Sequence, residues 1–424
     1  MKKIVGLVFF LLLFTETSYA SEFDIQKEIH TAEEGAVLII PAGRYEGNFT
    51  ITKNITLKGE SGTELVGLGT EAVLQIEGAQ AVMVDNLTLT TKGRAIVASD
   101  VEGLTLSRLK IKDVHNGIHV QRAEDLHLQQ ISVTGNDAHY SEKGNGIAIF
   151  KSKNVEVKDS EIQQVQDGIY IEEVERVKVT NNTVKNSRYG THFMYTSDAE
   201  VRNNVYLHNV TGLMIMMTEH LRASHNKLTN HQDLNSYGML LYDVQNISVI
   251  NNAVVNNRIG VAMQKSTAIL IEQNDFRMNQ TAIEGTKIDD ETRVTANQFT
   301  GNILTARSDN EGFQLSNNYY DDYSGLDLGG DGIGDTPYVA VSSFGQWMVR
   351  QPVYQYFIES PSVTLLTTLD TQINKSEKAV LVDMEPIVTE KSNEEKTKNL
   401  DIAQLIVGLL LSISGIWLWR RGMK

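Results

Sequence analysis

A pattern that repeats about every 22 residues constrains the fold of this chain more than any other feature. A Gly followed by an aliphatic residue or Thr recurs with gaps of 22, 22, 22, 26 and 22 residues, at Gly146, Gly168, Gly190, Gly212, Gly238 and Gly260. Asn recurs with gaps of 22, 22, 26, 22 and 23 residues, at Asn182, Asn204, Asn226, Asn252, Asn274 and Asn297. A fixed period of this length is typical of a solenoid.

The repeat unit predicts a β-solenoid. It is too short for a pair of helices, and its alternation and richness in Val, Ile, Thr and Asn indicate three short strands per turn. Equivalent residues of successive turns should lie about 4.7–4.9 Å apart, so the Asn side chains should form a hydrogen-bonded ladder. We predict an all-β, single-stranded right-handed parallel β-helix over residues 46–320. Residues 21–45 should form the N-terminal cap, with one short amphipathic helix.

Two insertions interrupt the period, at residues 136–143 and 230–236. Both lie between the Asn corner and the Gly corner, so they should project from one edge of the solenoid, about four turns apart. Insertions in repeat proteins often line the binding face.

The two ends of the chain indicate export and membrane attachment. Residues 1–20 combine Lys2 and Lys3, an apolar run and small residues before a cleavage site after Ala20, which predicts a secretory signal peptide. An Asp/Gly-rich loop and C-terminal cap (residues 321–386) and a polar linker (residues 387–400) follow the solenoid. Residues 402–419 then predict one transmembrane helix that holds the domain at the outer face of the cytoplasmic membrane. A buried amphipathic helix is the alternative for this last segment.

Composition excludes several classes of function. The chain has 53 acidic and 38 basic residues and a formal net charge of −15, which argues against a nucleic-acid partner. It has no Cys, which excludes disulfides and thiolate metal ligands.

Soft side chains occupy the outward positions of the middle turns. Residues two and four after each corner Gly should point outward, and there we find His192, Met194, Met214 and Met216, which we call the His–Met patch. Because thioether and imidazole groups suit Cu(I), the patch is a candidate copper site. The alternative is an apolar surface covered by another segment or a partner, with Met as adaptable filler. We expect His220, His225 and His231 to be surface or loop residues.

A second candidate metal site lies in the Asp/Gly-rich loop. Asp327, Asp331 and Asp335 recur at every fourth position, as the carboxylates of calcium loops do. Gly329 stands where an oxygen ligand is expected, so an Asp/Gly turn without metal is the alternative.

An enzyme acting on acidic polysaccharide, such as a lyase or epimerase, is the alternative class of function. Its chemistry needs a base and a cation in one groove. Arg176, Arg188, Arg202 and Arg222 fall in different columns, so we expect no Asp/His/Arg cluster on the face of the His–Met patch.

Several motifs resemble the NosD family, β-helix proteins of the pectin-lyase-like superfamily. They are residues 191–198, 212–216 and 238–242 in the middle turns, and residues 317–327 and 331–338 near the C-terminal end. The resemblance implies a non-catalytic accessory protein for maturation of the copper–sulfur centre of nitrous oxide reductase. It implies as partners the permease and ATPase of an ABC transporter (NosY and NosF type), a copper chaperone lipoprotein (NosL type) and the apo-reductase. It also strengthens the assignment of the His–Met patch to copper.

Overall fold

The computed structural model describes residues 23–309, 312–341, 360–362, 365–366 and 381–389. The predicted signal peptide (residues 1–20) and transmembrane helix (residues 402–419) lie outside the described residues. No helix within these ranges is long and apolar enough to cross a membrane.

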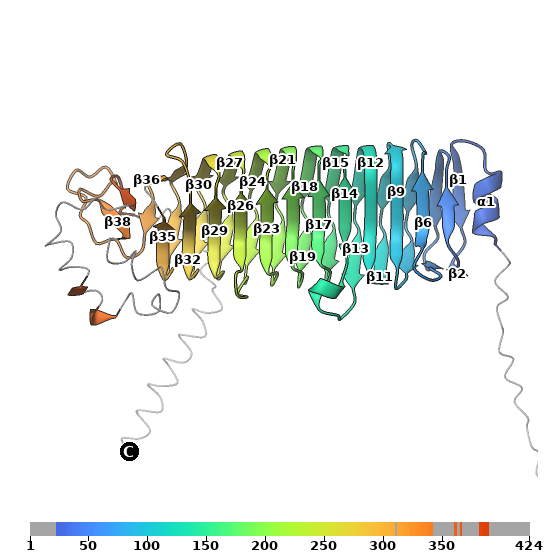
Figure 1. Cartoon of the computed structure of the whole chain (residues 1–424), viewed down its shortest axis with the longest axis horizontal. Coiled ribbons are helices and arrows are strands. Elements are labelled where there is room, and N and C mark those ends of the chain that lie inside the picture. Colours follow the sequence, from blue (N-terminus) through green and yellow to red (C-terminus); the bar gives the residue numbers. More distant parts are fainter. Residues whose placement is uncertain (1–22, 310–311, 342–359, 363–364, 367–380, 390–424) are drawn as a thin grey trace, which may run out of the picture. The chain divides into compact units, whose positions relative to one another are not determined.

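The described chain forms a right-handed parallel β-solenoid of about 13 turns, which confirms the predicted fold (Figure 1). Three strands make up each regular turn. Two strands of each turn belong to a 26-stranded sheet that folds over two faces, and the third belongs to a 13-stranded sheet. We name the faces in the order in which the chain crosses them from a corner Gly.

Strands of the same face pair along the solenoid. The first face contains β3 (Phe49–Ile51), β6 (Ala72–Glu77), β9 (Arg94–Glu102), the first half of β12 (Asn116–Gln129), β14 (Ile147–Phe150), β17 (Asp167–Glu172), β20 (Tyr189–Met194), β23 (Thr211–Met216), β26 (Tyr237–Tyr242), β29 (Ile259–Gln264), β32 (Thr281–Thr286) and β35 (Leu304–Ser308). The second face contains β1 (Ala36–Ile40), β4 (Ile55–Gly59), β7 (Met83–Asp85), β10 (Thr105–Ser107), the second half of β12, β15 (Lys153–Lys158), β18 (Glu175–Thr180), β21 (Ser197–Arg202), β24 (Glu219–Ser224), β27 (Gln245–Ile250), β30 (Thr267–Glu272), β33 (Arg293–Thr295) and β36 (Gln314–Ser316). The third face contains β2 (Gly43–Glu46), β5 (Thr63–Val66), β8 (Thr88–Thr90), β11 (Lys110–Val114), β13 (Ser132–Gly135), β16 (Glu161–Gln163), β19 (Thr183–Lys185), β22 (Val205–Leu207), β25 (Lys227–Thr229), β28 (Ala253–Val255), β31 (Asp275–Arg277), β34 (Gln298–Thr300) and β37 (Tyr319–Tyr320).

The predicted Asn ladder is confirmed at the corner between the second and third faces. Each Asn donates from Nδ2 to Oδ1 of the Asn in the next turn, over 2.9–3.1 Å from Asn182 to Asn318. The residue before each ladder Asn has a positive φ, for example 58° at Asn181, and short polar side chains tolerate this conformation best. The ladder ends on the buried carboxylate of Asp383, which accepts from Asn318 Nδ2 at 3.1 Å.

A second ladder runs between the third and first faces, and the sequence analysis missed it. Its members are Ser187, Asn209, His231, Asn257 and Asn279. His231 takes the place of an Asn: its Nδ1 accepts from the Asn209 N–H at 3.1 Å, and its side chain is fully buried. His231 lies in the loop between β25 and β26, as expected, but it is buried and not on the surface, whereas His220 and His225 are exposed as expected.

The corner Gly residues are required by the close stacking of the turns. A Cβ on Gly168 would lie 2.3 Å from Val184 Cγ1 and 2.6 Å from the Gly190 carbonyl oxygen. The neighbouring backbone leaves no room for a side chain there, which explains why Gly recurs at this corner from Gly146 to Gly260.

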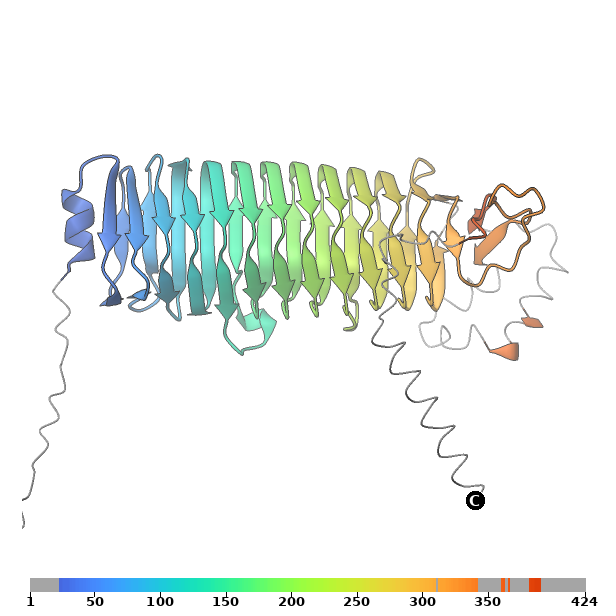
Figure 2. The same cartoon turned by 180° about the vertical axis from the view of Figure 1, so that it is seen from behind.

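Both ends of the solenoid are covered. Helix α1 (Ile25–Thr31) begins after Asp24, whose carboxylate accepts from the Lys27 N–H, and it buries Ile25 and Ile29 against the first turns (Figure 2). This confirms the predicted N-terminal helix. At the other end, β38 (Tyr338–Val341) pairs antiparallel with β39 (Leu381–Asp383). Ile387 bridges to Tyr319 and Ile333, so backbone pairing of the cap continues into the segment assigned from sequence to the linker.

The two insertions project from one edge of the solenoid, as expected. The first connects β13 to β14 and contains the short helix η1 (Tyr140–Glu142), which is visible below the sheets in Figure 1. The second connects β25 to β26, at the same corner four turns later.

Candidate functional site

The His–Met patch lies on the first face, where strand register brings its members together. His192 pairs with Met214 across β20 and β23, and Met194 pairs with Met216. Although these positions point away from the core, His192 and Met214 are each only 6% exposed. Met214 belongs to an apolar cluster outside the main core, completed by Leu240, Ile259, Ala262 and the partly buried Tyr189, Met216 and Tyr237.

An ion pair from the neighbouring turn anchors the imidazole of His192. Its Nδ1 lies 3.0 Å from Oδ2 of Asp167, a fully buried residue of β17. Arg188 binds the same carboxylate with two N–H groups, Nε to Oδ1 and Nη2 to Oδ2, each at 2.8 Å. A carboxylate paired with a guanidinium is a hydrogen-bond acceptor. His192 Nδ1 therefore carries the proton in this contact.

Two phenol rings hold the imidazole from its sides. The ring centroids of Tyr170 and Tyr189 lie 4.9 and 5.1 Å from that of His192, both in edge-to-face geometry. The Arg188 guanidinium in turn lies 4.4 Å from the centre of the Tyr189 ring, a cation–π contact. Rotation of the imidazole would break these contacts together.

Burial shifts the pKa values of the titratable groups around the patch. It raises the pKa of the Tyr170 hydroxyl, and the hydrogen bond to Glu172 adds to this effect. Burial likewise raises the pKa of Tyr189. For Arg188, burial lowers the pKa while the hydrogen bonds to Asp167 raise it, and the net result is a raised pKa. Around neutral pH the phenols are neutral and the guanidinium is charged.

The remaining ring nitrogen of His192 is unpaired within the part of the chain that the structure describes. Nε2 is buried and has no hydrogen-bond partner among the described residues. Leaving a buried polar atom unpaired costs about 1–3 kcal/mol, so such atoms call for a functional explanation. Imidazole with a lone pair on Nε2 and the thioether of Met214, the residue paired with His192, are soft, neutral donor types that suit Cu(I).

The four predicted ligands are not equivalent. The sulfur of Met194 lies 3.3 Å from the Tyr170 hydroxyl, which also donates to Glu172. Met216, by contrast, packs against the apolar cluster that contains Met214. Met194 thus has a polar partner, whereas Met214 and Met216 pack among apolar side chains.

The expectation that no Asp/His/Arg cluster occurs on this face is wrong. Asp167 and Arg188 stand one and two residues before a corner Gly, outside the alternating positions from which outward side chains were predicted. One signal was available in the sequence. Asp167 is acidic at a position where later turns carry Tyr189, Thr211 and Tyr237.

The predicted calcium loop uses its carboxylates for backbone contacts. Asp327 accepts from the N–H groups of Gly330, Asp331 and Gly332, and these bonds, led by that of Gly332, lower its pKa. Asp331 accepts from Ile333 N–H, and Asp335 from Leu328 N–H. Within the described ranges there is no group of three or more His, Cys, Asp or Glu residues that could hold a metal ion. The calcium prediction thus finds no support.

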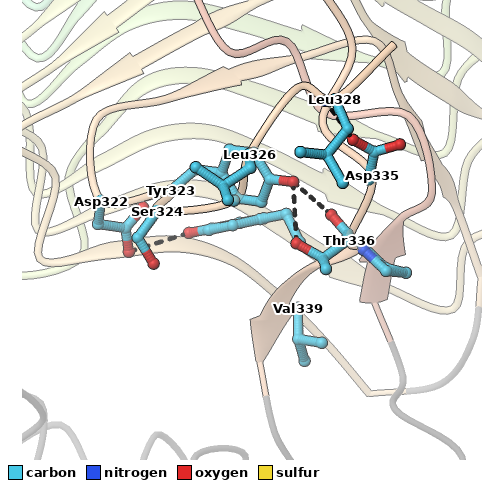
Figure 3. A pocket seen from close by; sticks show the side chains of 11 residues that line it. Asp322, Tyr323, Ser324, Leu326, Leu328, Asp335, Thr336 and Val339 are labelled. Atoms are coloured by element: carbon cyan, nitrogen blue, oxygen red, sulfur yellow. Dashed lines mark hydrogen bonds between the residues drawn. The ribbon is translucent and has the colours of Figure 1, made fainter.

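A cavity of about 530 Å³ lies beside this loop, and Asp335 is one of its lining residues (Figure 3). The Tyr323 hydroxyl donates to the Thr336 carbonyl oxygen and contacts the Thr336 hydroxyl at 3.1 Å. Leu326 and Leu328 are exposed at its rim. The hydrogen bonds of this region stabilise the loop and bring no donor set together.

Together, fold and patch define a parallel β-helix protein that presents an anchored imidazole and thioethers from one face. A family model described as "Periplasmic copper-binding protein (NosD)" matches residues 129–325, and one described as "Rhamnogalacturonase A/epimerase, pectate lyase-like" matches residues 18–215. The "Probable ABC transporter binding protein NosD" of Stutzerimonas stutzeri is 32% identical over 389 residues, 84% of this chain and 88% of that protein. The protein of the same name from Pseudomonas aeruginosa is 30% identical over 77% of this chain and 82% of its own length. The chain therefore belongs to the NosD family.

Solved structures show the fold alone. The A-module of the mannuronan C-5 epimerase AlgE6 from Azotobacter vinelandii superposes with a TM-score of 0.50 at 16% identity, over 69% of this chain and 87% of that one. A mutant of the periplasmic alginate epimerase AlgG gives the same TM-score at 11% identity, over 69% and 82% of the two chains.

Proposed function

We propose that this protein is an extracytoplasmic, non-catalytic relay for copper during maturation of the copper–sulfur centre of nitrous oxide reductase. The observation that carries the proposal is the buried, unpartnered Nε2 of His192, a residue that pairs with Met214 in the neighbouring turn. The family model's description as a periplasmic copper-binding protein supports the same function.

The donor set suits transfer more than storage. His192, Met214 and Met216 offer neutral donors, and the chain has no Cys whose thiolate would retain the metal. Imidazole and thioether donors bind Cu(I) in preference to hard cations. The metal is cargo in this proposal, received by the patch and passed on to a site with stronger sulfur donors.

The proposed partners are the permease and ATPase of an ABC transporter, a copper chaperone lipoprotein and the apo-reductase. The relatives' name, ABC transporter binding protein, supports the first of these. The segment predicted to span the membrane, residues 402–419, would tether the solenoid near such a transporter.

Maturation in cells tests the proposal. A strain lacking this protein would be complemented with the wild-type chain, with His192→Ala or with His119→Ala, and the purified reductase analysed for copper content and for the absorption of its copper–sulfur centre. His119 occupies the equivalent outward position on β12, three turns away, and serves as the matched control. We expect a reductase without this centre only for His192→Ala. A fully assembled centre with His192→Ala would contradict the proposal.

A polysaccharide-active enzyme is the second candidate, favoured by the pectate-lyase-like match and by the Asp167–Arg188–His192 cluster. Two features oppose it: Asp167 is fully buried and bound to Arg188, and the neighbouring outward residues are apolar. A general base must reach the substrate proton. Incubation of the purified protein with alginate or polygalacturonate, followed by proton NMR, separates the candidates, because turnover would favour the enzyme.

A further inference from the structure

We infer that the Asp167–Arg188 pair is a positioning unit that fixes His192 in one tautomer, with the proton on Nδ1 and the lone pair on Nε2. The inference rests on the proposed function for its purpose, because a lone pair on Nε2 is what a soft metal ion needs. It concerns residues that no sequence pattern had connected with the patch.

The first step is the saturation of the carboxylate. Asp167 Oδ1 accepts from Arg188 Nε at 2.8 Å, and Oδ2 accepts from Arg188 Nη2 at 2.8 Å and from His192 Nδ1 at 3.0 Å. Because the guanidinium bonds both oxygens in its planar fork, the carboxylate cannot rotate without breaking two charge-assisted hydrogen bonds.

The second step is the cost of the other tautomer. With the proton on Nε2, the Nδ1 lone pair would face the lone pairs of Asp167, and the buried Nε2–H would lack an acceptor among the described residues. Both consequences are unfavourable. Carboxylates that accept from the second ring nitrogen of metal-binding His residues act in the same way, by fixing the tautomer and the ring orientation.

The third step is charge balance. Arg188 offsets the charge of Asp167, so the anchor adds little net charge next to Nε2. A cation that reaches the patch therefore meets imidazole and thioether donors instead of a free carboxylate. This arrangement favours a soft monovalent ion over hard divalent ions.

The pair also joins the turn that carries His192 to the preceding turn. Asp167 belongs to β17, whereas Arg188 directly precedes β20 and His192 lies within it. Arg188 stacks on Tyr189, which in turn contacts the His192 ring. The anchor thus determines both the protonation and the orientation of the imidazole.

Nitrogen-15 NMR of the histidine rings in the intact, metal-free protein tests the inference directly. We expect a protonated Nδ1 and an unprotonated Nε2 for His192 in the wild type. Asp167→Ala removes the acceptor of the Nδ1 proton, so His192 should no longer hold a single tautomer, and the Cu(I) affinity should fall about 10–100-fold. Glu284→Gln is the matched control, since it removes a carboxylate that pairs with Arg307 on the same face, four turns away from His192. It should change neither quantity.

The outcomes separate this inference from the proposed function. A wild-type His192 with its proton on Nε2, or an Asp167→Ala variant that keeps the wild-type tautomer, would overturn the inference, whether or not copper binds. The expected tautomers without Cu(I) binding to the wild type would support the positioning role and overturn the copper relay. If Asp167→Ala does not fold, the wild-type spectrum still decides. Arg188→Lys, which keeps the positive charge but lacks the planar guanidinium, then serves as the test variant in place of the Asp167 variant.

Discussion

Within the same turns, the first and second faces carry opposite kinds of outward side chain. The first face presents Tyr170, His192, Met214 and Leu240 in consecutive turns. The second face presents the column Lys178, Glu200, Arg222 and Ser248. Backbone pairing is parallel and regular on both faces, so the backbone itself does not account for the difference.

The outward side chains of the two faces differ in their exposure to water. Lys178 and Arg222 are exposed and Glu200 is half-buried, as is typical of a solvated sheet. On the first face, His192 and Met214 are almost completely buried. Buried polar groups there are hydrogen-bonded, as in the Asp167–Arg188 pair, whereas Nε2 of His192 lacks a partner among the described residues. In the compared turns, the comparison teaches that the buried imidazole and thioether belong to the first face.

The largest expected effect is on stability, and it should occur only on the first face. Arg188→Ala leaves the Asp167 carboxylate buried without its counterion, which typically costs about 3–5 kcal/mol. Lys178→Ala removes an exposed cation of the second face and should change the free energy of unfolding by less than about 1 kcal/mol. Denaturant unfolding of both variants measures the contrast. Equal losses of stability in the two variants would contradict the proposed difference between the faces.

Much of the fold was predictable from sequence because stacking repeats a requirement at every turn. Gly168 must be Gly because the next turn leaves no room for a Cβ. Asn182 must be Asn because its amide bonds to the turn above. Strand register then predicted the pairing of His192 with Met214.

The remaining features depend on contacts that a period does not encode. Asp167 and Arg188 lie near a corner, where the inward–outward alternation of a strand no longer decides the direction of a side chain. His231 fills an Asn position because its Nδ1 can accept as an amide oxygen does. Asp383 completes the Asn ladder from a segment 65 residues beyond Asn318, and only the folded chain shows this.

The pH dependence of stability should distinguish the buried His231, beside the first face, from exposed titratable residues of the second face. Burial lowers the pKa of His231 to about 4, whereas an unfolded chain titrates near 6.5. The unfolded state therefore binds the proton first as the pH falls. Stability should decrease between pH 6.5 and 4, by about 3 kcal/mol in total, and then level off.

His231→Asn should flatten this profile, because Asn fits the ladder and does not titrate. His220→Asn, an exposed change on the second face, is the control and should keep the wild-type profile. Thermal unfolding as a function of pH measures both. A flat profile for the wild type would contradict the assignment.

A smaller effect distinguishes methionines within the first face. Met214→Leu should reduce Cu(I) affinity about tenfold, or about 1.4 kcal/mol, because it removes a thioether beside His192. Met194→Leu should leave the affinity within about twofold, since the sulfur of Met194 already contacts the Tyr170 hydroxyl. Both changes nearly conserve volume, so stability should change by less than about 1.5 kcal/mol. Equal losses of affinity would contradict this distinction between Met194 and Met214.

The most direct measurement is an anaerobic Cu(I) titration of the intact chain against a competing chelator. His192→Ala would be compared with His119→Ala on the first face and Arg222→Ala on the second. The account predicts that the wild type binds one Cu(I) ion and that both controls match it. His192→Ala should bind at least about 100-fold more weakly, the upper end of the loss seen when only a supporting residue is removed. Equal binding by His192→Ala, or no binding by the wild type, would contradict the account.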